Sequence, residues 1–186
     1  MATERDRQAT LRSYLQQMTD LILQDESQGP LNQPSIRAAA NALTDTVLRT
    51  LDGPGNGILI RFLHESELIR TDNPIISLAL ADLSHAGFSS ANLAGCSLSQ
   101  ASLTNADPYY VDLSEADQTG ANLTDAHLFR ANLTEADLTG AILDDADLTE
   151  AILTGARMAE GQIAKTFSVD RAIMPYQTSD DKSATL

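Results

Sequence analysis

Several residue types that carry chemistry are scarce in this chain of 186 residues. It has one cysteine, and its four Phe and four Tyr residues make only eight aromatic side chains of these kinds. A single cysteine excludes a framework of intramolecular disulfides. Cys96 falls at an inward position of the repeat described below, so we expect a buried structural thiol rather than a reactive one.

Positive charge is also scarce. The chain has 12 Lys and Arg against 26 Asp and Glu, a net charge of −14. Residues 1–80 carry −3, whereas residues 81–165 hold 13 acids and 3 bases, a net −10. Phosphate contacts need clustered Lys and Arg, so direct nucleic-acid binding is not expected. An acidic coat that keeps the protein soluble accounts for this surplus without a further function.

Long hydrophobic runs are missing. No apolar run reaches 18 residues, so no membrane segment is expected. The segment 1–7 lacks the apolar region of a signal peptide, and together these features predict a soluble, cytoplasmic protein.

Catalytic and cofactor motifs are missing as well. The sequence contains no phosphate-binding loop, dinucleotide fingerprint or nucleophile elbow. The segment 64–68 begins like a zinc-protease motif, but Leu68 stands where the second histidine is required. We therefore predict no enzyme, no cofactor and no metal site.

What the chain does have is a five-residue repeat from Ala81 to Lys165. Seventeen units fit this frame, with Ala at the first position in fourteen and Leu at the third position in twelve. Such a short fixed period indicates identical units that stack on one another.

Neither a continuous strand nor a helix can bury this pattern on one side. In a continuous strand, the apolar positions would change to the opposite face at every fifth residue. In a helix, the Leu positions would be spread around every face. A chain that turns a corner once per unit buries both positions, and four corners close a coil of about twenty residues. The core residues expected from this frame are Phe88, Leu93, Leu103, Leu123, Leu128, Leu133, Leu138 and Leu148.

The tandem pattern Ala-Asp/Asn-Leu-x-x over residues 76–165 resembles the pentapeptide-repeat family. The known fold of that family implies a β-solenoid, namely a right-handed quadrilateral β-helix. Seventeen units correspond to about four coils, and 76–80 is similar to a degenerate opening unit. At the usual spacing of paired strands, the shaft is roughly 20 Å long.

The first eighty residues show helical periodicity instead. Apolar faces in segments 11–22, 36–51 and 58–69 predict about three helices, with Ser35 as the N-cap of the second and Gly53–Gly55 as its end. These helices are expected to form an α-helical cap, because an open coil exposes both its core and its strand edges. The run 46–78 is similar to the leader of certain bacterial, often cyanobacterial, members of the family.

The predicted organisation has four parts. Residues 1–74 form the N-terminal helical cap, 75–165 the β-helix, 166–175 a closing segment and 176–186 a flexible tail. Four apolar residues of the closing segment are expected to cover the last coil: Phe167, Val169, Ile173 and Met174.

Two inward positions break the repeat. Pro108 removes a backbone donor, which a sheet tolerates at an edge or a bulge, so a local bulge or loop is expected there. Gln118 places an amide in an apolar column, where it is costly unless it is hydrogen-bonded. The irregularity is either a tolerated imperfection or a site shaped by the defect.

Beside this break, outward positions gather aromatic side chains. Tyr109 and Phe129 occupy the same position one coil apart and are expected to stack, with Tyr110 and Arg130 beside them. These four residues are a candidate partner contact. Solvated surface aromatics, or a dimer contact, are the simpler interpretations.

These observations favour a non-enzymatic interaction or scaffold protein, a monomer or weak dimer whose partner is a protein.

One alternative is a DNA-mimic inhibitor or protector of gyrase, because some members of the family resemble duplex DNA. The thirteen acids on the shaft are comparable in number to the roughly twelve charges of 20 Å of B-DNA. However, these acids fall on all four faces, the shaft is short, and no apolar C-terminal helix is present for dimerisation. The other alternative is an enzymatic or ligand site between the helices and the first coil.

Overall fold

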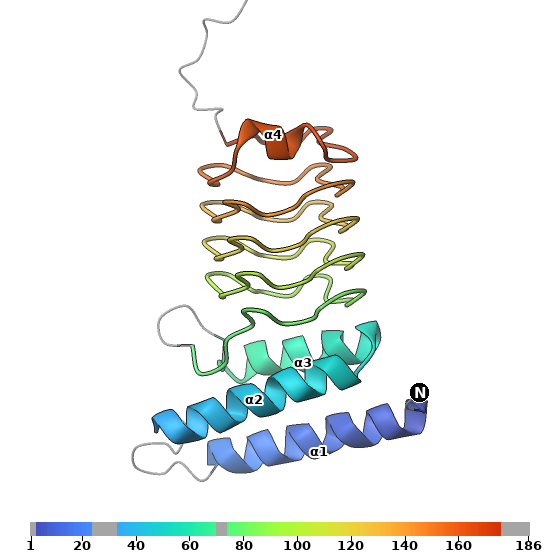
Figure 1. Ribbon diagram of the computed structural model, residues 1–186, viewed down its shortest axis with the longest axis vertical. Helices are drawn as coiled ribbons and strands as arrows, with labels where there is room; N and C mark the ends of the chain where they lie inside the picture. The colour runs from blue at the N-terminus through green and yellow to red at the C-terminus, as the bar shows by residue number, and fades with distance from the viewer. Residues whose placement is uncertain (1–2, 24–32, 70–73, 176–186) are drawn as a thin grey trace, which may run out of the picture.

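The computed structural model describes residues 3–23, 33–69 and 74–175. Three helices lie below a stack of coils, and a short fourth helix lies on top of the stack (Figure 1). The helices are α1 (Glu4–Leu23), α2 (Pro34–Thr50), α3 (Gly53–Glu65) and α4 (Glu160–Ile163). The tail predicted at 176–186 lies outside the described residues.

The stacked coils form a β-solenoid that follows the predicted frame. Parallel bridges join residues 20 apart, from Asp82 with Ser102 to Asp137 with Arg157. Within one such step, Asn132 N donates to Val111 O of the preceding coil at 2.9 Å. The twenty-residue register predicted from the repeat is therefore confirmed.

Each corner of a coil is a β-turn between consecutive units. Leu123 O accepts a hydrogen bond from Ala126 N at 3.0 Å, and the intervening Asp125 has a φ of 56°. The frequent Asp or Asn at the second position supports the corner, because its side chain accepts a backbone N–H two residues on, as Asn132 Oδ1 does from Thr134 N at 3.1 Å. The left-handed fifth position was not anticipated, although glycines at this position were a signal for it: Gly95, Gly120, Gly140 and Gly155.

The interior of the solenoid consists of the third-position side chains and the alanines between them. The predicted core residues are all buried, with at most 2% of any of them exposed: Phe88, Leu93, Leu103, Leu123, Leu128, Leu133, Leu138 and Leu148. The opening unit behaves like the others, since Leu78 is buried and Leu78 N donates to Ser97 O of the next coil.

Helix α1 packs against α2 and α3 through one apolar face. Tyr14 and Met18 are buried, and the Tyr14 hydroxyl lies 2.7 Å from Thr44 Oγ1 of α2. Helix α2 is held to the opening unit by Asn41, whose Nδ2 donates to Ile75 O and whose Oδ1 accepts from Ser77 N, each at 2.7 Å.

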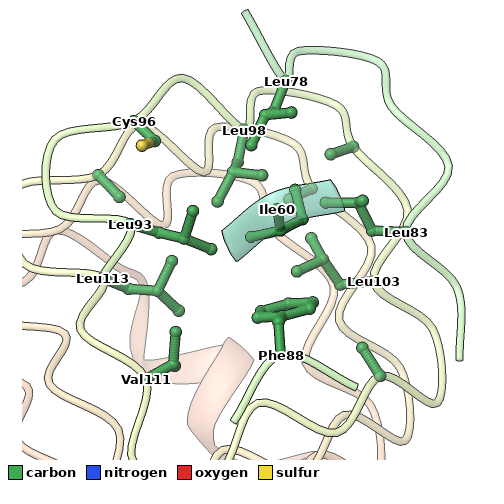
Figure 2. Packing of buried hydrophobic residues seen from close by; sticks show 14 of the residues in the cluster. Ile60, Leu78, Leu83, Phe88, Leu93, Cys96, Leu98, Leu103, Val111 and Leu113 are labelled. Atoms are coloured by element: carbon green, nitrogen blue, oxygen red, sulfur yellow. The ribbon is translucent and has the colours of Figure 1, made fainter. Parts of the chain in front are cut away.

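Helix α3 lies directly on the first coil. Figure 2 shows Ile60 of α3 among the inward-pointing side chains of the coils, and Ile60 is fully buried. The approach is so close that a Cβ on Gly53 or Gly57 would overlap the backbone carbonyl oxygen of His85 or Gly87, respectively. Glycine is therefore required where α3 touches the coil.

Two helix boundaries differ from the prediction. Helix α2 begins at Pro34 after an N-cap at Gln33, so Ser35 is not the cap. Proline suits the first turn because its missing N–H would have no partner there. The segment Gly53–Gly55, which was expected to end the preceding helix, forms the first turn of α3. Asp52 is the N-cap of α3, because its side chain accepts a hydrogen bond from Gly55 N at 3.1 Å.

The C-terminal end of the repeat also departs from the prediction. The seventeenth unit is replaced by α4, where Gln162 Nε2 donates to Leu138 O and Ala141 O at 2.8 and 2.7 Å. Phe167 and Ile173 are 75% and 45% exposed and do not cover the last coil. One extra residue in this stretch shifts the bridges to a spacing of 21, so Ile173 pairs with the outward-facing Ile152 instead of lying level with the buried Leu153. Val169 and Met174 are partly buried against the core.

The bulge expected at Pro108 is not found in the described coil. Pro108 is buried in its column, and the next turn is regular, with Val111 N donating to Pro108 O at 3.2 Å. The neighbouring bonds from Asp107 N to Ala86 O and from Tyr110 N to Phe129 O are intact. Proline removes one ladder donor, and these flanking bonds hold the register without it.

Candidate functional site

The predicted contact residues Tyr109, Tyr110, Phe129 and Arg130, called the aromatic patch from here on, lie together on one corner of the solenoid. They occupy the fourth and fifth positions of two units one coil apart, which Tyr110 N joins to Phe129 O at 3.0 Å. Tyr110 and Arg130 have φ values of 57° and 56°, so the corner turn directs both side chains outward. The exposed fractions are 36% for Tyr109 and 51% for Tyr110.

The rings meet edge to face rather than in the parallel stack that was expected. Phe129 lies between both tyrosines, with centroid distances of 6.3 Å to Tyr109 and 5.7 Å to Tyr110 and interplanar angles of 77° and 85°. Aromatic pairs prefer this geometry because the positive edge of one ring faces the negative face of the other. Phe129 thereby holds two exposed tyrosines in a defined orientation.

Arg130 completes the patch by binding its own neighbours. Its Nη1 donates to the Tyr110 hydroxyl at 3.0 Å, and its Nε pairs with Glu150. The guanidinium carbon also lies 5.1 Å from the Phe129 centroid and 5.5 Å from that of Tyr110. Arg130 therefore helps to hold the rings of Tyr110 and Phe129 in place.

On its other side, Tyr109 contacts a polar group of residues that the sequence analysis did not assign to the patch. The His127 ring stacks on Tyr109 at 5.7 Å and 15°, and His127 Nδ1 lies 3.4 Å from Asp107 Oδ1. The charge of Asp107, some burial and the charge of Asp147 raise the pKa of Tyr109. Asp107, His127 and Asp147 are spaced twenty residues apart. This spacing was the signal in the sequence that could have placed them next to one another.

The carboxylate of Asp107 differs from those that support other corners. Asp147 Oδ1 accepts from Thr149 N at 2.9 Å in the usual turn. In the described part of the chain no such bond from Tyr109 N to Asp107 is found, and the Asp107 carboxylate faces His127 and the Tyr109 hydroxyl instead. It therefore adds negative charge directly beside the aromatic patch.

The second irregular residue, Gln118, lies inside the solenoid. Its side chain is fully buried, and neither Oε1 nor Nε2 has a hydrogen-bond partner among the described residues. A buried amide group without partners destabilises a fold by about 1–3 kcal/mol. It lies in the column with Leu98 and Leu138, away from the aromatic patch, so the two features of the irregular region are separate.

Replacing Gln118 with Leu is expected to stabilise the protein by about 2 kcal/mol, because the substitution removes the unpaired amide and continues the leucine column. Urea unfolding monitored by circular dichroism measures the change. Gln162→Leu is the matched control and should destabilise, since Gln162 makes three hydrogen bonds at the C-terminal end. A loss of stability in Gln118→Leu would contradict the unpaired state of this amide.

Cys96 is a buried thiol whose Sγ lies 3.0 Å from Ile69 O. Burial raises its pKa to about 12. Only the thiolate is nucleophilic, so the reactive fraction at neutral pH is about a thousandfold below that of an ordinary cysteine.

We therefore expect Cys96 in the native protein to resist a thiol reagent such as Ellman's reagent at pH 8. The same thiol should react within minutes once the protein is unfolded in guanidinium chloride. Absorbance of the released thiolate follows both reactions. Rapid native labelling would show that this part of the solenoid opens easily.

The junction between α3 and the first coil contains a cleft of about 260 Å³. Its polar lining includes Arg61, His64, Glu65, Ser90 and Asn92. Among the residues that the structure describes, no group of three His, Cys, Asp or Glu is arranged to hold a metal ion. None of the helices in that part is long and apolar enough to cross a membrane.

The repeat is the basis of a family assignment. Residues 81–117, 109–145 and 121–159 match a family profile that describes eight consecutive pentapeptide repeats. Residues 81–159 of the chain are therefore pentapeptide repeats. A search of curated proteins gives no match.

Solved structures similar to the chain include other pentapeptide-repeat proteins. Rfr23 from the cyanobacterium Cyanothece is 35% identical, with 55% of this chain and 58% of that one covered and a TM-score of 0.41. A protein of the Arabidopsis thaliana thylakoid lumen is 28% identical, with coverages of 52% and 59% and a TM-score of 0.30. QnrB1, a plasmid-mediated fluoroquinolone resistance protein, is 20% identical, with coverages of 53% and 65% and a TM-score of 0.39. The chain spans less than two thirds of each of these structures.

Proposed function

We propose that this protein is a non-enzymatic interaction or scaffold protein of the cytoplasm that binds another protein through the aromatic patch. The scaffold is a right-handed quadrilateral β-helix of about four coils, with α1–α3 as its N-terminal cap. The observation that supports the patch is that Tyr109 and Tyr110 are exposed yet ordered by Phe129 and Arg130.

This ordering matters for binding because it lowers the entropy that association must remove. Tyrosines carry large contact areas with few rotatable bonds and often dominate interfaces. The backbone that carries the aromatic patch is stabilised by ladder bonds to the coils above and below. The four side chains of the patch therefore keep one arrangement before a partner binds. A solvated surface does not require such internal contacts.

A pull-down from host lysate tests the proposal with Tyr109→Ala/Phe129→Ala. Some proteins will be recovered specifically with the wild type. With this variant, the recovered amount of these proteins is expected to fall at least about tenfold, the usual effect of removing interface anchors. The control is Ile142→Ala/Ile152→Ala, which removes two other exposed apolar side chains from the solenoid and should retain the partners. Equal recovery by the wild type and the patch variant would rule out the patch.

The DNA-mimic alternative rests on the acidic excess of residues 81–165. Several of these carboxylates already serve corners or ion pairs, for example Asp137 with Thr139 N and Arg157. The alternative requires that the protein inhibit or protect gyrase in a supercoiling assay. The absence of any effect at micromolar protein would exclude it.

A further inference from the structure

The partner chemistry follows from which groups of the patch are still available. Arg130 is the basic residue of the patch, and its guanidinium is engaged by Glu150 and by the Tyr110 hydroxyl. An acidic partner segment would have to break these contacts to reach it. What remains accessible is the surface of the two tyrosines and about half of the neighbouring Asp107 side chain, which is 47% exposed.

Arg130 also demonstrates what the rings attract. Its guanidinium lies over Phe129 and Tyr110 at 5.1 and 5.5 Å, within the range of cation–π attraction. Tyr109 and Tyr110 expose 36% and 51% of their surface, so a second cation can approach these rings from solvent.

The charge around the rings favours the same class of ligand. Asp107 and Asp147 both neighbour His127, whose ring stacks on Tyr109, and the whole repeat region carries a net −10. A field of this sign attracts a cationic segment and repels an acidic one.

We propose that the aromatic patch binds a basic segment of its partner protein, which places an arginine or lysine side chain on Tyr109 and Tyr110 between the neighbouring carboxylates. This inference rests on the proposed interaction function and adds the chemistry of the partner. It requires both parts of the site, the rings for the cation–π contact and Asp107 and Asp147 for the charge.

A labelled peptide of alternating arginine and glycine, titrated with the full chain and followed by fluorescence anisotropy, tests the proposal. Tyr109→Leu/Tyr110→Leu keeps apolar side chains but removes the rings, and should weaken binding about tenfold, as expected for two cation–π contacts. Leucine is compatible with the turn, since Leu80 has a φ of 63°.

The charge requirement is tested by Asp107→Asn/Asp147→Asn, which should weaken binding by a similar factor. The control Asp117→Asn/Asp137→Asn removes the same charge in another column of the solenoid and should weaken binding less than about twofold, through long-range attraction alone. Asparagine already occupies the second position at Asn92, Asn122 and Asn132, so both pairs are expected to fold, which circular dichroism checks.

Equal losses from the two pairs of asparagine variants would overturn the inference, because binding would then depend only on total charge. A peptide with citrulline in place of arginine that binds equally well would overturn the need for a cation. If no arginine peptide binds while lysate partners still depend on the patch, the basic-segment inference fails and the proposed function stands. If the pull-down is also insensitive to the patch, both fail.

Discussion

Replacing Leu133 with Asp is expected to unfold the solenoid. Leu133 is fully buried, and the aspartate would face an interior of leucine and alanine side chains. A buried charge without a partner destabilises a fold by about 3–5 kcal/mol, and the lost apolar burial adds about 2 kcal/mol. The sum is comparable to the total stability of an ordinary domain. Circular dichroism and urea unfolding measure the loss.

The matched control is Ile142→Asp. Ile142 lies at the second, outward position of its unit and is 47% exposed, so the same kind of substitution leaves the charge in solvent. Aspartate at this position also supports the corner in other units, for example in Asp137 with Thr139 N. We expect a change within about 1 kcal/mol. Similar unfolding midpoints for the two variants would mean that the inward and outward positions have been exchanged.

Replacing Gly57 with Ala is expected to detach α3 from the first coil, with a loss of about 3 kcal/mol. The added Cβ would overlap the Gly87 carbonyl oxygen, and neither backbone can rotate away as a side chain could. The loss would occur although alanine favours a helix over glycine by about 1 kcal/mol. Thermal unfolding followed at 222 nm, where the helices dominate the signal, measures the shift in Tm.

Gly161→Ala is the corresponding control, because a Cβ at Gly161 of α4 meets no atom within 4 Å. Its Tm should stay within a few degrees of the wild type. Hydrogen exchange refines the test, since Gly57→Ala should release the amides of α1–α3 while those of the central coils remain protected. An unchanged Tm in Gly57→Ala would show that α3 does not depend on this contact.

The candidate site was predictable in its members but not in its geometry. The register of twenty residues placed Tyr109 over Phe129 and Tyr110 over Arg130, because vertical neighbours in a solenoid follow from the period alone. Their edge-to-face contacts and the ion pair of Arg130 with Glu150 depend on rotamers, which no repeat specifies. The role of Asp107 was likewise missed, since its carboxylate faces His127 and the Tyr109 hydroxyl instead of supporting its own corner.

The sequence by itself determined the coil length, the inward residues and the stacking register. A period that fits neither a strand nor a helix leaves few ways to bury Ala and Leu, and each unit repeats the same solution. Local breaks in the period were less informative. Pro108 predicted a bulge that does not form, because the ladder bonds of the neighbouring coils hold the chain in place.

Only the tertiary structure decided how the ends of the repeat are covered. Gly53 and Gly57 are ordinary turn and helix residues in the sequence, and their role is set by a coil backbone about thirty residues away. At the other end, Gln162 and α4 replace a repeat unit because the last carbonyls need donors. Contacts between unlike elements have no period, so they follow from packing and hydrogen-bond demand rather than from the pattern of residues.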